Sequence, residues 1–175
     1  MTLNWKTTNN CLHAARSTQG SARRRRRPRR CATVTRGRGL LARLAAALIG
    51  FPPAGENVPL RVDFKVEQGR ERWTRTFAGH AFHSTQEQGR GPFEWLVCER
   101  FGPLCAGMAL VLDDGKLRLI LRRWSVFGIL LPVWLAPRGD SYEYAENGRF
   151  HFHVEIAHPF TGLIVGYRGW LVPRA

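Results

Sequence analysis

Acidic residues are missing from the first third of this 175-residue chain. Residues 1–55 hold 12 of the 27 Lys and Arg residues and none of the 13 Asp and Glu residues. The formal net charge of +14 therefore belongs almost entirely to this segment, and the rest of the chain is close to neutral. Binding to nucleic acid or to an anionic surface through net charge is accordingly expected only from the N-terminal segment.

Motifs for metal binding, redox chemistry and common catalysis are also missing. The four cysteines form no Cys-x-x-Cys pair, and no histidine lies at zinc-finger spacing from them. There is no Gly-x-Ser-x-Gly nucleophile motif and no Gly-x-Gly-x-x-Gly after a predicted strand. We therefore expect no cofactor. The cysteines are interpreted as reduced thiols, although a disulfide between Cys98 and Cys105 is a second possibility.

No apolar run reaches the roughly 20 residues that a transmembrane helix needs. The closest is Leu40–Phe51, which Arg43 interrupts. Basic residues followed by an apolar run resemble a secretion signal, but this run starts far into the chain and ends without a small-x-small cleavage site. The sequence therefore predicts a cytoplasmic protein without a transmembrane segment.

The N-terminal segment is dominated by arginine and shows no hydrophobic periodicity. Such a run repels itself and cannot bury a face, so we predict a disordered tail over residues 1–33. A solvated tail, or residues translated from a wrong frame or start site, is favoured over a tether for nucleic acid or membrane. The basic tail contains Arg23, Arg24, Arg25, Arg26, Arg27, Arg29 and Arg30.

The first predicted element is a helix over Leu40–Ile49. Leucines recur at positions 40, 44 and 48, with Leu41 beside them, and alanines favour the helix. Gly50 and the prolines that follow end it. We expect the helix to pack on a sheet, with a membrane-surface helix as the alternative because arginines lie nearby.

From residue 58 onward the hydrophobic period changes to two, which predicts strands. In Leu60–Val66, for example, apolar residues alternate with Arg61, Asp63 and Lys65. Asp113-Asp114-Gly115 and Asn147-Gly148 are strong hairpin signals. Eight or nine short strands in consecutive hairpins predict a mainly β fold of the α+β kind. We expect a curved antiparallel sheet or a partly closed β-barrel, with the one N-terminal helix packed on it.

Six segments, spread in order along the chain, carry a family resemblance. Together they resemble the bacterial domain of unknown function 4166 over about residues 34–173, so we expect a single domain from 34 to 175. The segments are Arg36-Gly37-Arg38-Gly39-Leu40-Leu41-Ala42-Arg43, Phe51-Pro52-Pro53-Ala54-Gly55, Trp73-Thr74-Arg75-Thr76-Phe77, Glu99-Arg100-Phe101-Gly102-Pro103, Pro159-Phe160-Thr161-Gly162 and Tyr167-Arg168-Gly169-Trp170-Leu171.

This resemblance implies little chemistry. Members of the family occur alone or behind a Rossmann-type dehydrogenase-like domain, which implies a dehydrogenase-like partner. No catalytic residue can be carried over from the family. The arginine run before residue 34 departs from the mixed composition that members have there, which favours the frame-error interpretation of the tail.

Strand parity singles out two charged residues. Arg75 shares its face with Trp73 and Phe77, and Glu99 shares its face with Trp95, Val97 and Phe101. If these aromatic faces point inward, each strand carries one charge into the interior, where an unpaired charge costs several kcal/mol. We therefore predict that Arg75 and Glu99 meet, or that one of them meets a ligand, with a structural ion pair favoured over a ligand site.

His151 and His153 share a strand face with Glu155 and form a weak candidate for a metal site. The solvent face of an amphipathic strand is the favoured interpretation, because no ligand from a third segment is evident.

Three functional hypotheses follow. The first is a non-enzymatic module that binds a small apolar ligand or assists a dehydrogenase-like protein, because apolar strands are plentiful and catalytic motifs are not. The second is an enzyme with a pocket that uses Arg75, Glu99 and Tyr167, beside Trp73. The third, which we consider unlikely, is nonspecific nucleic-acid binding through the basic tail.

Overall fold

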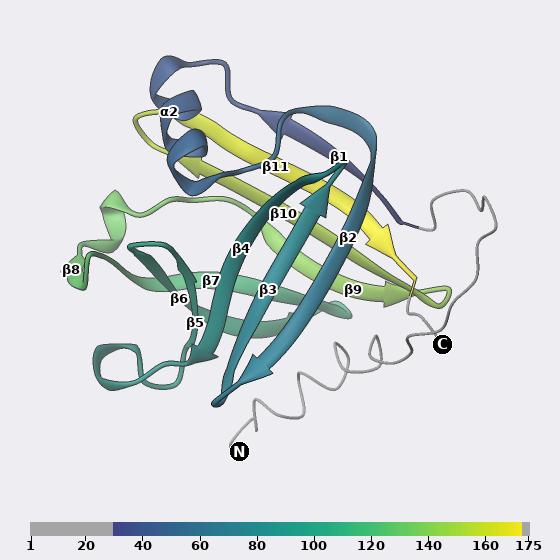
Figure 1. Ribbon diagram of the computed structural model, residues 1–175. Helices are drawn as coiled ribbons and strands as arrows, with labels where there is room; N and C mark the ends of the chain where they lie inside the picture. The colour runs from purple at the N-terminus through teal and green to yellow at the C-terminus, as the bar shows by residue number, and fades with distance from the viewer. Residues whose placement is uncertain (1–29, 173–175) are drawn as a thin grey trace.

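A computed structural model gives the fold and describes residues 30–172. The mainly β class is confirmed: ten antiparallel strands close into a barrel, with one short helix near the N-terminus (Figure 1). An eleventh strand, β8, pairs only with β7 at the edge. The strands are β1 Arg30–Arg36, β2 Gly55–Glu67, β3 Arg70–Phe77, β4 His80–Gln88, β5 Val97–Phe101, β6 Leu104–Asp113, β7 Lys116–Val126, β8 Ile129–Leu131, β9 Ser141–Glu146, β10 Arg149–His158 and β11 Gly162–Leu171, and the helices are α2 Leu40–Ile49, η1 Gly91–Phe93 and η2 Val133–Leu135.

Most neighbours in the barrel are also neighbours in sequence, because each hairpin turn returns the chain beside itself. Two pairings are not local. β1 pairs with β11 along its whole length, from Arg30 opposite Leu171 to Arg36 opposite Val165. The other is between β7 and β9, which meet only at Leu117 and Arg118, and the local β6–β7 hairpin then closes the sheet. The barrel is therefore closed rather than partly closed.

Strand β1 corrects the expected domain boundary. Residues 30–33 were assigned to the basic tail, yet they pair with β11, and Ala32 is buried in the core. The partner strand lies more than 130 residues away, so local periodicity gave no sign of it. The remainder of the predicted tail lies outside the described residues.

The core fills the part of the barrel nearest the helix. Phe77 and Phe82 stack at 6.0 Å between ring centroids, and Tyr167 meets both edge-on. Phe51, just after the helix, adds its ring to Phe82 at 5.6 Å. These aromatic contacts give one continuous apolar cluster that closes this end.

Helix α2 packs through its alanines and not through its leucines. Ala42 and Ala46 are fully buried, because only a small side chain allows the helix to lie this close to β11. Gly50 then ends the helix in the left-handed conformation, with φ of 79°. The predicted leucine contact face is wrong: Leu40, Leu41, Leu44 and Leu48 are 81%, 61%, 58% and 80% exposed.

The loop before β5 gives another correction. Trp95 was expected to share the inward face of Glu99, but it precedes the strand with φ of 69° and is 79% exposed. The loop lies over the outer face of the barrel instead. A Cβ atom on Gly107 would come within 2.5 Å of Phe93, so glycine is needed for this contact. Residues of this outer face are buried as a result, among them Cys98.

Candidate functional site

The barrel interior contains an ion pair bridged by a hydroxyl group. Arg75 Nη2 donates a hydrogen bond to Glu99 Oε1 at 3.0 Å, and Arg75 Nη1 donates to Ser84 Oγ at 2.7 Å. Ser84 Oγ in turn donates to the same carboxylate oxygen at 2.6 Å. Strands β3, β4 and β5 are consecutive neighbours, so three inward positions bring these groups together. The contact that strand parity predicts between Arg75 and Glu99 is present.

Aromatic rings surround the guanidinium group. The Arg75 Cζ atom lies 4.9 Å from the ring centroid of Trp73 and 5.4 Å from that of Phe82. Burial, the largest single cause, lowers the pKa of Arg75, but the charge and hydrogen bond of Glu99 act with Tyr167 and Glu143 to outweigh it, and the net direction is upward. Arg75 is therefore a cation whose charge is already neutralised within the barrel.

Tyr167 also faces inward, from β11. It is 7% exposed, and burial raises the pKa of its hydroxyl group to about 12. Its ring packs on Phe77 and Phe152. The phenol stays neutral at physiological pH and lines the same interior as Arg75, although no hydrogen bond joins the two.

Glu143 is an interior carboxyl group that the sequence analysis did not single out. It lies on β9 opposite Phe152 of β10 and Leu117 of β7, which both face inward. Burial raises the pKa of Glu143 to about 7, with the charge of Glu99 acting in the same direction and that of Arg75 opposing it. No residue in the described part of the chain forms a hydrogen bond with its carboxyl group. Counting alternate residues back along the strand from the Asn147-Gly148 turn would have placed Glu143 on the inward face.

One buried side-chain polar atom has no hydrogen-bond partner among residues 30–172. It is Nε1 of Trp73, whose indole faces inward between Phe64 and Ser84. Buried N–H groups are almost always hydrogen-bonded, because leaving one unsatisfied costs about 1–3 kcal/mol. An oxygen atom of a ligand would satisfy this N–H group as a hydrogen-bond acceptor.

The wall formed by β6 and β7 differs from the packed core. Its inward positions are apolar and most of them are only half-buried, whereas Trp124 on β7 is 8% exposed. The half-buried inward side chains are Leu104, Ala106, Met108 and Leu110 on β6, and Leu117, Leu119 and Leu121 on β7.

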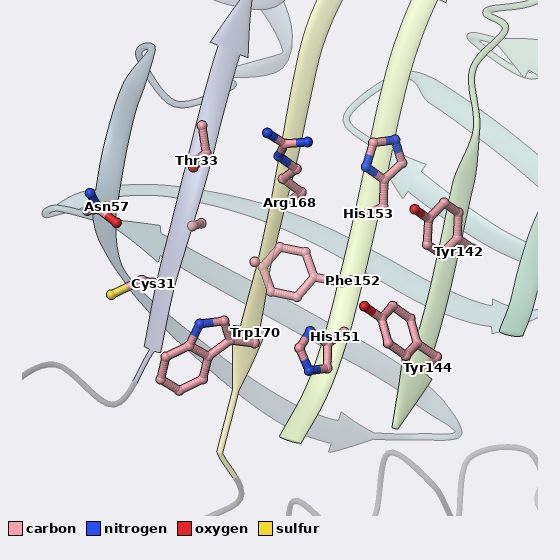
Figure 2. A pocket seen from close by; sticks show the side chains of 12 residues that line it. Cys31, Thr33, Asn57, Tyr142, Tyr144, His151, Phe152, His153, Arg168 and Trp170 are labelled. Carbon is pink, nitrogen blue, oxygen red and sulfur yellow. The ribbon is translucent and has the colours of Figure 1, made fainter. Parts of the chain in front are cut away.

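A concavity with a volume of about 370 Å³ lies on the outer surface of β1, β9, β10 and β11 (Figure 2). His151 stacks on Tyr144 at 4.7 Å, and His153 stacks on Tyr142 at 4.9 Å. Both histidines thus use their ring faces for cross-strand contacts, as on an ordinary amphipathic strand. Within the described residues, no group of three or more His, Cys, Asp or Glu side chains is placed to hold a metal ion.

Comparisons with known proteins agree with the resemblance noted from the sequence. Neither the curated proteins nor the solved structures contain a match to this chain. The family model described as domain of unknown function (DUF4166) matches residues 31–171, which extends from the second residue of β1 to the last residue of β11. The matched segment thus contains nearly the whole closed barrel, and the chain belongs to the DUF4166 family.

Proposed function

We propose that the barrel binds a small, largely apolar and electrically neutral molecule in its interior. Two observations together carry the proposal: the Trp73 N–H group has no hydrogen-bond partner, and the inward apolar side chains of β6 and β7 are only half-buried. A ligand that places an alcohol, ketone or ester oxygen near Trp73 and a hydrocarbon body along that wall would satisfy both.

The interior charges favour a neutral head group over a carboxylate. Arg75 is already matched by Glu99, so it offers no free positive charge to an anion. Glu143, with a pKa of about 7, adds partial negative charge at neutral pH. A fatty carboxylate would therefore meet repulsion and lose its hydration without a cationic partner.

Such a module could hold an apolar substrate or product for a dehydrogenase-like partner, which would fit a neutral alcohol or ketone. This accessory role is part of the proposal and rests on the arrangement of domains that the family resemblance implies.

The test compares two ligands that differ only at the head group. Equilibrium binding of dodecanol and dodecanoate to the full chain is measured by calorimetry at about pH 8, below the ligands' aggregation thresholds. We expect dodecanol to bind at least about tenfold more tightly, a difference of roughly 1.4 kcal/mol. Trp73→Phe keeps an aromatic ring, although a smaller one, and removes the N–H group, so it should weaken the binding of dodecanol more than that of dodecanoate. Tighter binding of dodecanoate would refute the neutral-ligand proposal.

A second candidate function, acid–base catalysis in the interior, is favoured by Glu143. A carboxyl group with a pKa of about 7 is suited to exchange protons at neutral pH, and Arg75 and Glu99 lie in the same interior rather than facing solvent. Alcohols, ketones and esters incubated with the protein would be recovered and analysed by mass spectrometry. Conversion that Glu143→Gln abolishes would support an enzyme, whereas unchanged recovery favours a binding module.

A further inference from the structure

The end of the barrel that carries α2 is lined by exposed apolar side chains. We call it the helix end and define it as residues 36–55, 78–80, 102–103, 127–137 and 158–162. Hydrogen bonds tie these segments together: His80 Nε2 to the Gly50 carbonyl, the Phe127 amide to the Pro103 carbonyl, and His158 Nε2 to the Leu135 carbonyl. Figure 1 shows α2 and β8 on the same side of the barrel.

Most exposed large apolar residues of the described chain lie at this end. The four α2 leucines are there, and Phe127 and Phe160 protrude from turns with 80% and 71% exposure. The remaining members come from β8 and η2, including Trp134 at 65%. Exposed apolar side chains gathered at one end of a barrel favour contact with an apolar partner. The exposed set is Leu40, Leu41, Leu44, Leu48, Phe127, Ile129, Leu130, Val133, Trp134 and Phe160.

Local charge favours an anionic partner at the helix end. This end contains no Asp or Glu, although Glu56 follows directly, and Arg38 and Arg43 lie exposed beside the leucines. The connections at the opposite end carry both signs, because Glu67, Glu94, Asp113, Asp114 and Glu146 lie in or next to turns that also hold Arg70, Arg90, Lys116 and Arg149. An anionic surface therefore meets positive side chains without acidic neighbours at the helix end.

We infer that the helix end docks on an anionic lipid bilayer. Leucines and aromatic rings enter the boundary between head groups and acyl chains, and Arg38 and Arg43 remain at the level of the lipid phosphates. None of the helices in residues 30–172 has the length and apolar character needed to cross a bilayer. The association is thus peripheral. It does not depend on the proposed interior ligand, but the two together make the bilayer the source or destination of that ligand.

The test measures binding of the full chain to vesicles of phosphatidylcholine with phosphatidylglycerol, in the absence of any interior ligand. Sedimentation at about 0.5 M salt suppresses the contribution of the basic tail, because the screening length falls below about 5 Å. Leu41→Glu/Leu48→Glu is compared with Val66→Glu/Leu112→Glu, which changes the charge equally at the opposite end. All four positions are at least half exposed, so both variants should fold, and thermal unfolding checks this.

We expect the helix-end variant to lose about a hundredfold in partitioning, roughly tenfold per leucine, and the control to bind like the natural chain. Brominated acyl chains should quench tryptophan emission, and Trp134→Phe should remove most of that quenching. Arg38→Gln/Arg43→Gln should weaken binding at low salt. Equal binding by both glutamate variants, or self-association through the helix end without vesicle binding, would overturn the inference. Dodecanol affinity is measured separately, so failure of docking and failure of the interior site are distinguishable.

Discussion

Arg75 and Glu99 form an ion pair of 3.0 Å inside the closed barrel, and the Ser84 hydroxyl group bonds to both. These hydrogen bonds join three side chains from three neighbouring strands. The charged cluster is therefore complete without a ligand, and the buried Trp73 N–H group beside it has no hydrogen-bond partner. Recognition of a neutral molecule is consistent with this arrangement.

The first prediction concerns the loss of one partner of this ion pair. Glu99→Gln should lower the free energy of unfolding by about 2–4 kcal/mol, because it leaves the buried Arg75 charge without its counter-ion. Urea unfolding at about pH 7 measures this free energy of unfolding. Arg61→Gln, at the exposed pair with Asp63, is the control and should cost no more than about 1 kcal/mol. Wild-type stability in Glu99→Gln would show that the pair is not buried as described.

Much of the barrel could be predicted from local sequence patterns. Alternation and the Asn147-Gly148 and Asp113-Asp114-Gly115 turns placed most strands, and parity alone brought Arg75 and Glu99 together. Strand β1 was missed because its partner β11 is far away in the chain. The leucines of α2 were assigned to a buried face because periodicity reports amphipathicity but does not say which face meets protein. Ser84 was missed because a neutral serine on a strand gives no signal, and Glu143 was missed because strand parity was not counted back from the Asn147-Gly148 turn.

The second prediction concerns pH. The pKa of Glu143 is about 7 in the folded protein, above its ordinary value of 4.5, so the folded state holds this proton more tightly than the unfolded state. Stability from this group is present below about pH 4.5 and is lost as the pH rises toward 7. Glu143→Gln should remove that loss and be more stable than wild type at about pH 8, by about 1–3 kcal/mol. Urea unfolding of both proteins from about pH 5 to 8 gives the difference; parallel curves would contradict the raised pKa.

The third prediction separates the two faces of α2. Leu44→Ser should change the free energy of unfolding by about 0.5 kcal/mol or less, because the side chain is exposed. Ala46→Leu should destabilise by about 1–3 kcal/mol, because Ala46 is fully buried and a larger side chain pushes the helix away from the barrel. Thermal unfolding of the two variants and of the wild type measures these changes in stability. The opposite order of stabilities would restore the leucines as the packing face.

The fourth prediction concerns thiol reactivity. Burial raises the pKa of Cys98 to about 12, with neighbouring Cys105 acting in the same direction, so almost no thiolate forms at about pH 8. Both cysteines are buried and free. Iodoacetamide should label neither until the protein unfolds, as peptide mass spectrometry would show. Rapid labelling of Cys98 in the native protein would mean that the loop over Gly107 opens readily.

The central claim is that the ligand lies inside the barrel against β6 and β7, and one matched pair of variants tests it most directly. Ala106 points inward opposite Glu99, whereas Ala109 points outward on the same strand. Ala106→Phe fills the interior and Ala109→Phe adds the same ring outside. Native mass spectrometry with added dodecanol should show one bound molecule for wild type and Ala109→Phe, and none for Ala106→Phe. Equal occupancy in both folded variants, or no bound dodecanol in wild type, would contradict interior binding.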